Sequence, residues 1–262
     1  MTARSPDIPA ASIVIPTLNE EKYLPVLLDS LRRVSAPMEI IVVDGASTDR
    51  TVQVVERYKS LFAGDASLRV LHSDARNISL QRNIGAAAAS HELLIFCDAD
   101  VLIPSHETYA TLMTRFADGR LTVAAPVLVP IEPGLGFKLA YKIVYWLQKL
   151  VLSHGRPYFA GSFLMTTRPV FSRLGGFDTK IVLAEDVDYS LRAAKLGPYQ
   201  LMDVRMTISA RRLARYGYWW IIEALPTIVR YIRTGSISPK DIRYPFGDYD
   251  KPDGGGSGRS SD

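Results

Sequence analysis

The chain has 262 residues, 47% of them hydrophobic, and its 31 Lys and Arg against 27 Asp and Glu leave a formal net charge of +4. This length and composition exclude a disordered chain and predict one large α/β domain with a sizeable core. The small net charge gives no support for a nucleic-acid partner. The single cysteine, Cys97, excludes an intramolecular disulfide, and the apolar run around it predicts a core residue.

No targeting or anchoring segment is recognisable in the sequence. Residues 1–11 lack the apolar stretch of a signal peptide, and no segment reaches the roughly 18 uncharged apolar residues of a spanning helix. We therefore expect a cytoplasmic protein.

Short apolar runs alternate with amphipathic segments between residues 10 and 130, which is typical of β–α units on a mainly parallel sheet. One of Ser47, Thr48 and Asp49 is expected to cap the second helix, and Asn19 can cap the first. The small residues around Gly85 predict a helix packed closely on the sheet. The expected strands are 12–16, 39–43, 69–72 and 93–97, and the expected helices are 20–33, 49–61 and 79–89.

Residues 135–152 predict a longer amphipathic helix. Two arrangements are open: the apolar stripe packs on the domain with the lysines in solvent, or the helix lies on a membrane surface. The apolar stripe is Leu139, Ala140, Ile143, Leu147 and Leu150, and a second stripe holds Lys138, Lys142, Tyr145 and Lys149.

The C-terminal part of the chain is basic and aromatic. Residues 205–233 contain six Arg and one Glu, interleaved with Tyr and Trp, as membrane interfaces favour. Arg211, Arg212 and Arg215 could instead close over a pyrophosphate, because guanidinium groups pair with phosphate oxygens. Residues 246–262, rich in Gly and Ser, predict a flexible tail.

Asp98 and Asp100 directly follow the apolar strand 93–97, and this position is the strongest functional signal in the sequence. Ligands of open α/β sheets bind outside the carboxyl ends of the strands, where these two acids are expected. Carboxylate oxygens suit Mg²⁺ or Mn²⁺ shared with substrate phosphates. Two more Asp-x-Asp spellings occur, at 186–188 near an expected helix start and at 248–250 in the tail.

Three further polar motifs lie at expected strand ends or turns. The motif 16–20 leaves the first strand, and Asp44 ends the second, where it could accept a hydrogen bond from a base or a ribose. The third motif, 184–188, contains the adjacent acids Glu185 and Asp186. Crowded carboxylates in a cleft can have raised pKa values, which suits one of them to act as a general base.

Together these motifs resemble those of family 2 glycosyltransferases with the GT-A fold, over roughly residues 11–197. The resemblance implies an α/β fold with a Rossmann-like, mainly parallel sheet flanked by helices, to which the basic sequence pattern adds a C-terminal amphipathic helical segment. We therefore expect one domain over 1–245, with a nucleotide-sugar-binding half at 10–125, an acceptor half at 126–205 and the basic aromatic segment at 206–245. The motifs are Pro16-Thr17-Leu18-Asn19-Glu20, Val42-Val43-Asp44-Gly45-Ala46-Ser47-Thr48-Asp49, Arg82-Asn83-Ile84-Gly85, Asp98-Ala99-Asp100, Gly175-Gly176-Phe177-Asp178 and Glu185-Asp186.

For function, the resemblance implies inverting transfer of a sugar from a nucleotide diphosphate sugar to an acceptor hydroxyl, with Mn²⁺ or Mg²⁺ as cofactor. Asp186 would take the proton of the acceptor, with Glu185 beside it. Asp98 would contact ribose or metal, and Asp100 would hold the metal on the pyrophosphate. The remaining donor-site residues would be Pro16, Thr17 and Glu20 around the nucleotide, Asp44 at the base and Arg82 near it.

One position departs from the pattern of some relatives, because Leu102 stands where they place a further polar metal ligand. His154 could supply a distant ligand, although a surface histidine is the simpler expectation. The acceptor is expected to be a sugar or a lipid-linked molecule, with peripheral contact to the anionic cytosolic face of a membrane. Three alternatives remain: transfer to a polyprenyl phosphate, a nucleotidyltransferase, and a non-catalytic nucleotide-sugar or membrane-binding protein.

Overall fold

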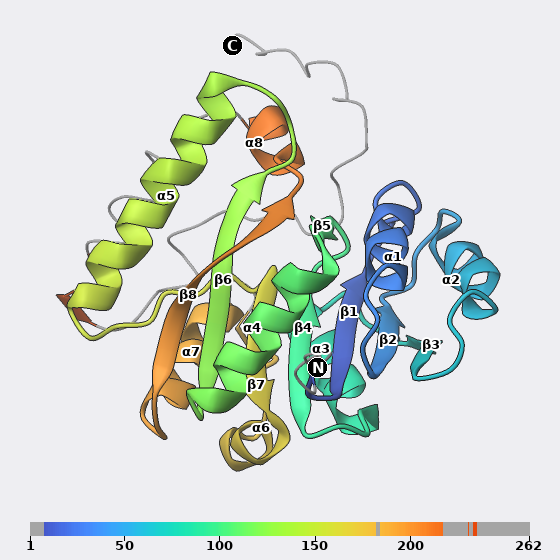
Figure 1. Cartoon of the computed structure of the whole chain (residues 1–262), viewed down its shortest axis with the longest axis horizontal. Coiled ribbons are helices and arrows are strands. Elements are labelled where there is room, and N and C mark those ends of the chain that lie inside the picture. The colour runs from blue at the N-terminus through green and yellow to red at the C-terminus, as the bar shows by residue number, and fades with distance from the viewer. Residues whose placement is uncertain (1–7, 182–183, 217–229, 231–232, 235–262) are drawn as a thin grey trace, which may run out of the picture.

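A computed structural model describes residues 8–181, 184–216, 230 and 233–234 of the chain (Figure 1). Its strands form one sheet in the order β3-β2-β1-β4-β7-β6-β8-β5. The strands are β1 Ala11–Thr17, β2 Met38–Asp44, β3 Ala66–His72, β4 Leu93–Cys97, β5 Val101–Leu102, β6 Val123–Pro130, β7 Phe163–Thr167 and β8 Tyr199–Ile208. The helices are α1 Leu24–Arg32, α2 Thr51–Lys59, α3 Ile78–Ala88, α4 His106–Asp118, α5 Leu135–Ser153, α6 Arg168–Leu174, α7 Glu185–Ala194 and α8 Arg211–Tyr216.

The predicted parallel sheet is confirmed for the first four strands. β1 pairs in parallel with β2 and β4, and β2 pairs in parallel with β3. The sheet is mixed beyond β4, because β7 runs antiparallel to both β4 and β6. All strands belong to one continuous sheet, so the expected donor and acceptor halves share it.

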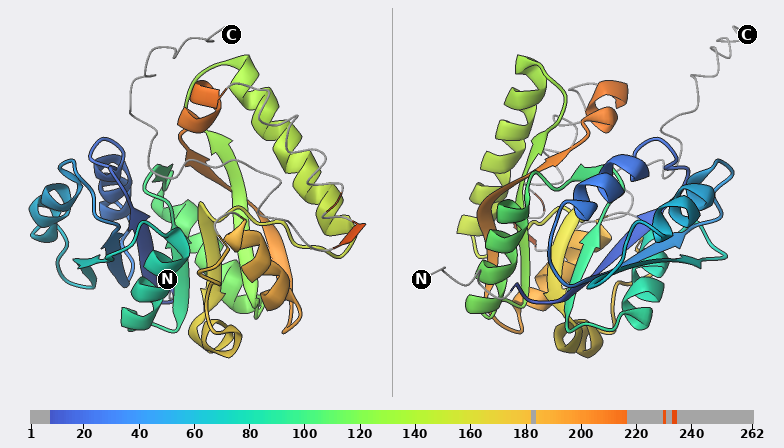
Figure 2. Two further views of the ribbon diagram at one scale, coloured as in Figure 1. Left: turned by 180° about the vertical axis from the view of Figure 1, so that it is seen from behind. Right: turned by 45° about the vertical axis from the view of Figure 1, so that its right-hand side comes forward.

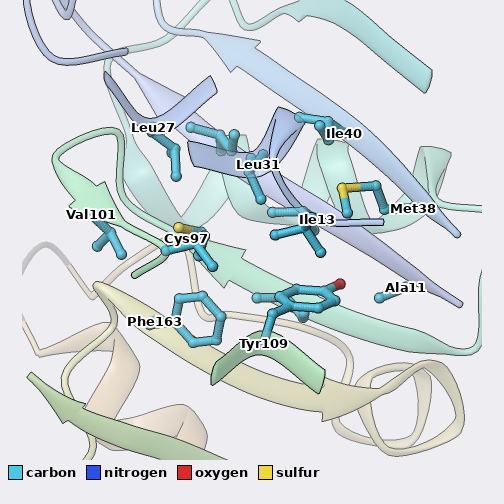
Figure 3. Close-up of a cluster of buried hydrophobic side chains, with 14 of the residues drawn as sticks. Ala11, Ile13, Leu27, Leu31, Met38, Ile40, Cys97, Val101, Tyr109 and Phe163 are labelled. Atoms are coloured by element: carbon cyan, nitrogen blue, oxygen red, sulfur yellow. The ribbon is translucent and has the colours of Figure 1, made fainter. Parts of the chain in front are cut away.

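Helices cover both faces of the sheet, as Figure 2 shows from two further directions. One face packs against α1, α2 and α4, and Figure 3 shows Leu27, Leu31 and Tyr109 from these helices over Ile13 and Cys97 of the strands. The other face packs against α3, α6 and α7. Alternate strand residues face opposite layers, so every residue of β1, β2 and β4 is buried, as the continuous apolar runs predict.

Two helix starts differ from the prediction. α1 begins at Leu24 rather than residue 20, with Tyr23 at its N-cap. α2 begins at Thr51, and its N-cap is Arg50 rather than one of residues 47–49. The capping predictions were therefore wrong, and the reason is tertiary: the polar side chains at each strand exit accept hydrogen bonds from backbone amides of the opposite turn.

α3 packs closely on the sheet, as the small residues predict. A Cβ atom at Gly85 would overlap Val14 Cγ1 of β1 and would lie 3.1 Å from Val43 Cγ2 of β2. The close approach brings the first turns of α3 against the carboxyl ends of the strands. Gln81 and Arg82 are fully buried there.

α5 is a helix, as predicted, but only two of the five residues of the expected apolar stripe, Ala140 and Leu147, pack on the domain. Leu139, Ile143 and Leu150 are exposed, whereas Ala140 and Val151 are buried. Within the described part of the chain, no helix is both long enough and apolar enough to cross a membrane.

Candidate functional site

The exits of β1 and β2 form two interlocked turns. Asn19 adopts a left-handed backbone conformation (φ 59°), and its Oδ1 accepts a hydrogen bond from the Thr48 amide at 2.8 Å. The Asn19 amide donates to Ser47 Oγ at 2.9 Å, and the Glu20 amide donates to Thr51 Oγ1 at 2.8 Å. Asn19 therefore joins the two strand exits instead of capping α1.

Asp44 is buried at the end of β2. Its Oδ2 accepts a hydrogen bond from the Ser47 amide at 3.0 Å, which holds the second turn. Gln81 of α3 donates from Nε2 to the carbonyl oxygens of Thr17 and Val43, at 2.8 Å each. The helix thus joins β1 and β2 at the edge of the predicted base pocket. Contact of Asp44 with a base stays a prediction.

Glu20 and Asp100 share a third partner, Arg211, which begins α8. Both carboxylate oxygens of Glu20 accept from the Arg211 guanidinium, at 2.7 and 2.8 Å, and its Nε donates to Asp100 Oδ2 at 2.9 Å. The guanidinium also lies over the Tyr23 ring, 4.3 Å from the ring centroid. The sequence left two roles open for Arg211, contact with a pyrophosphate or contact with a membrane. The structure places this side chain at the predicted donor site and not on an outer face.

Backbone contacts explain how Arg211 reaches the acids. β5 follows Asp100 and pairs with the end of β8, so the Ser209 amide donates to the Asp100 carbonyl at 3.0 Å. Two residues later the chain enters α8. The side chains of Arg212 and Arg215, and most of the basic aromatic segment after them, lie outside the described residues, so their membrane contact stays a prediction.

A second arginine, Arg82, connects the two predicted halves of the site. Its guanidinium donates to Glu185 at 2.6 Å, to Asp98 at 3.3 Å and to the Gly161 carbonyl at 3.2 Å. Arg82 is 1% exposed, so both ion pairs are screened little by water. The resemblance implies that Arg82 lies near the nucleotide base, whereas the structure places it between Asp98 and the acid pair of α7.

Asp186 lies beside Glu185 at the N-terminus of α7. Its carboxylate accepts from the Gly161 amide and from the Val187 amide, the latter at 2.8 Å. Ala184, just before the pair, has a left-handed backbone (φ 61°), an uncommon conformation for a residue with a Cβ. Glu185 is buried, whereas Asp186 is half-buried, so Asp186 is the member of the pair that an incoming molecule could touch.

Gly161 explains why the acids from distant segments come together. β7 pairs antiparallel with β4, with Phe163 opposite Cys97, so the residues before β7 lie beside those after β4. A Cβ at Gly161 would lie 2.7 Å from Arg82 Nη2 and 2.9 Å from Asp186 Cβ. Only glycine fits, and the sequence offered no signal for it, because a single glycine in a loop is a common occurrence.

Burial dominates the electrostatics of the site. Burial raises the pKa of Glu20 to about 7, although the hydrogen bond from Arg211 opposes the shift. Burial and the neighbouring Asp186 raise the pKa of Glu185 against the effect of Arg82. Burial likewise raises the pKa of Asp186, although Arg82 and the Gly161 amide lower it. A carboxylate with a raised pKa is a stronger proton acceptor than an ordinary one.

Several predicted residues lie apart from these contacts. His154 is exposed at the end of α5, and its Nδ1 contacts the Leu150 carbonyl at 2.8 Å, as expected of a surface histidine. Asp188 pairs with Arg192 one helical turn later. Pro16 is a buried residue of β1. Residues 248–250 lie outside the described part of the chain.

The side chains of the site show what kind of divalent metal ion they could bind. The described residues contain no group of three or more His, Cys, Asp and Glu side chains able to hold one. Asp98 and Asp100 provide hard oxygen atoms at the strand exit, and Mg²⁺ commonly takes one or two carboxylates and completes its shell with substrate phosphates and water. The acids therefore fit an ion that binds together with a diphosphate, not one that the protein holds alone.

Solved structures share this fold. A mannosyltransferase from Pyrobaculum calidifontis, in complex with GDP-Man and Mn²⁺, matches with a TM-score of 0.66 and 24% identity over 88% of this chain and 66% of that one. A fragment of Staphylococcus aureus TarS in complex with UDP matches with a TM-score of 0.58 and 21% identity, over 88% of this chain and 68% of that one. At these identities the likeness shows the fold alone, which is the predicted GT-A arrangement.

Curated relatives are also glycosyltransferases by name. The poly(ribitol-phosphate) beta-N-acetylglucosaminyltransferase TarS of S. aureus is 35% identical over 92 residues, or 34% of this chain and 16% of that enzyme. The O-antigen chain rhamnosyltransferase RfbN of Salmonella typhimurium is 24% identical over 198 residues, or 71% of this chain and 61% of that enzyme. The chain therefore spans less than two thirds of the length of each.

The family model described as Glycosyl transferase family 2 matches residues 12–175. That span contains the interlocked exits of β1 and β2, Arg82, both acids after β4 and Gly161, and because it covers more than half of the chain, the chain belongs to glycosyl transferase family 2.

Proposed function

We propose that the chain is a metal-dependent, inverting glycosyltransferase that moves a sugar from a nucleotide diphosphate sugar to an acceptor hydroxyl. The observation that carries the proposal is the position of Arg82. It contacts both Asp98, the acid proposed for the donor side, and Glu185, the neighbour of the proposed general base Asp186. Family membership and the fold agree with it. The related structures hold GDP-Man with Mn²⁺ and UDP-GlcNAc, which supports a nucleotide sugar as the donor class.

On the acceptor side, Asp186 would take the proton of the attacking hydroxyl. As the acceptor oxygen bonds to the anomeric carbon, the bond from that carbon to the diphosphate breaks, and the acceptor proton passes to the Asp186 carboxylate. The amides of Gly161 and Val187 fix the orientation of that carboxylate. Glu185 is committed to Arg82, so it would hold the arginine in place and not accept the proton.

On the donor side, Asp98 and Asp100 would hold the metal ion, which supplies Lewis-acid stabilisation to the leaving diphosphate. Glu20 and Arg211 lie at the same strand exits, and a guanidinium can donate to two phosphate oxygens at once. We expect Arg211 to exchange its contact with Asp100 for the diphosphate when the donor binds. Asp44, at the end of β2, would face the base.

Donor binding can be tested by thermal unfolding with UDP and GDP, each with and without Mn²⁺. Assays of the hydrolysis of UDP-sugars and GDP-sugars follow. A nucleotide at 100 times its dissociation constant stabilises the folded chain by about 2.7 kcal/mol. Asp100→Ala should remove the Mn²⁺-dependent part of this stabilisation and the hydrolysis. Asp118→Ala, an exposed acid at the end of α4, is the matched control and should change neither. If no nucleotide stabilises the wild type, or Asp100→Ala behaves like the control, the proposal fails.

The acceptor class can be tested separately through Asp186. A hydroxyl must lose its proton, so Asp186→Asn should reduce turnover by about 10²-fold or more, the usual contribution of a general base. A polyprenyl phosphate is already ionised, so transfer to it should survive this change. Asp188→Asn, which alters the acid paired with Arg192, is the control. Full activity of Asp186→Asn toward hydroxyl acceptors would contradict the role of Asp186.

A further inference from the structure

α5 exposes an apolar face along its whole length. Five large side chains on this helix are between 42% and 84% exposed, although helices of a folded domain usually turn such residues inward. They are three or four residues apart, so they lie on one side of the helix in a continuous strip. This apolar strip consists of Leu135, Leu139, Ile143, Trp146 and Leu150.

A row of positive charge runs beside the apolar strip. Lys138, Lys142 and Lys149 are exposed, and each directly precedes a residue of the strip, so the charges lie along one border of it. The ammonium group of Lys149 lies 5.9 Å from the centroid of the Tyr145 ring. α5 contains no Asp or Glu, so these charges have no acidic partner on their own helix.

The opposite face of α5 is anchored to the domain, which holds the apolar strip outward. Ala140 packs with Ala210 and Leu213 at α8, and Val151 packs with Val187 of α7. In the views of Figures 1 and 2, α5 lies at the outer side of the molecule, away from α1 and α2. The exposed strip is therefore an outer surface of a fixed helix.

We propose that this face of α5 docks on an anionic lipid bilayer, with the apolar strip in the acyl boundary and the three lysines among the phosphate headgroups. The charge pattern favours this partner over a second copy of the chain. Two copies joined through their apolar strips would bring rows of lysines together without any acid on α5 to pair them, whereas anionic headgroups neutralise the lysines. Trp146 also suits the lipid–water boundary, where one part of its ring is apolar and another is wet.

Vesicle flotation of the full chain tests the proposal. We expect binding to vesicles of phosphatidylcholine with phosphatidylglycerol, and much weaker binding to phosphatidylcholine alone. Removing the charges with Lys138→Gln, Lys142→Gln and Lys149→Gln should weaken binding by about fivefold per lysine, or about a hundredfold together. The control Lys59→Gln, Lys180→Gln and Lys195→Gln changes the net charge equally and should keep the binding.

The apolar strip is tested by Leu139→Gln, Ile143→Gln and Trp146→Gln, which should abolish flotation. Val26 and Leu61 are each 46% exposed, similar to the strip, so Val26→Gln with Leu61→Gln is the matched control and should bind as the wild type does. All these side chains are exposed, and an unchanged thermal midpoint will verify that each variant folds.

The fluorescence of Trp146 measures the contact between α5 and the bilayer directly. In the variant with Trp219→Phe and Trp220→Phe it is the only tryptophan, and its emission should shift to shorter wavelength and be quenched by brominated lipids. Absence of flotation, equal binding to both vesicle types, or full binding by the α5 variants would overturn the proposal. A wild-type dimer that the Gln variants dissociate would overturn it in favour of a second copy. None of these readouts depends on sugar transfer, so the two proposals fail independently.

Discussion

Arg82 illustrates how one buried charge organises this site. It comes from a motif that the sequence already suggested, yet its two partners, Asp98 and Glu185, lie 16 and 103 residues away. A buried guanidinium is tolerated only where carboxylates neutralise it and hydrogen bonds satisfy it. The two acids therefore depend on Arg82, and removing the arginine leaves both carboxylates without a positive partner in this cluster.

We predict that Arg82→Met lowers the free energy of unfolding by about 3–5 kcal/mol, because the buried Glu185 then loses its partner. Urea denaturation at neutral pH measures this quantity. The control is Arg32→Met, which breaks the exposed pair with Asp29 and should cost less than about 1 kcal/mol. Equal losses for the two variants would show that Arg82 contributes no more than a surface ion pair.

At the scale of elements, the contact between α3 and β1 positions Gln81 and Arg82 at the strand exits. The contact depends on Gly85, since any side chain there meets Val14 and Val43. A helix displaced outward at this point would carry Arg82 away from Asp98 and Glu185. Close packing of one element thus maintains the geometry of the site.

We predict that Gly85→Ala destabilises the chain by about 1–3 kcal/mol through overpacking. In the double variant with Val14→Ala the added methyl group has room. The double variant should therefore lose less stability than the sum of the losses of the two single variants, by a coupling energy of about 0.5–3 kcal/mol. The exposed Ala87→Ser on the same helix should stay within about 0.5 kcal/mol of wild type. Strict additivity in the denaturation cycle would contradict the close contact.

At the scale of the whole molecule, the crowded acids make the stability of the donor-free chain depend on pH. Glu20 has an ordinary pKa of 4.5 when unfolded and about 7 when folded. Between these values the folded chain binds more protons than the unfolded chain, so stability is lost as pH rises. Glu185 and Asp186, whose pKa values are also raised, act in the same direction.

We predict that the free energy of unfolding of the donor-free chain falls as pH rises from 4.5 to about 7 and then levels off with respect to these groups. Glu20→Gln removes one titrating group, so the slope of that fall should be smaller than in the wild type. Denaturation at a series of pH values measures the slope. Glu56→Gln, an exposed acid paired with Lys59, should leave it unchanged. An unaltered slope in Glu20→Gln would show that Glu20 titrates normally.

The sequence by itself determined the strand-rich N-terminal half of the fold and where its polar residues gather. Buried parallel strands are continuous apolar runs, and chain order alone places their carboxyl ends at one edge of the sheet. For this reason the sequence alone predicts that Thr17, Asp44, Asp98 and Asp100 lie in one region. The acidic motif at 184–188 supplied Glu185 and Asp186 and the family resemblance added Arg82, but neither predicted the contacts among them.

The tertiary structure alone decided the long-range contacts and the outward face of α5. Arg211 lies 191 residues from Glu20, and Gly161 reaches Asp186 only because β7 runs antiparallel to β4. Such contacts depend on how strands pair, which local patterns do not encode. For α5 the amphipathic pattern contained apolar residues on more than one side, and packing against α7 and α8 buried the small residues and left the large ones facing outward.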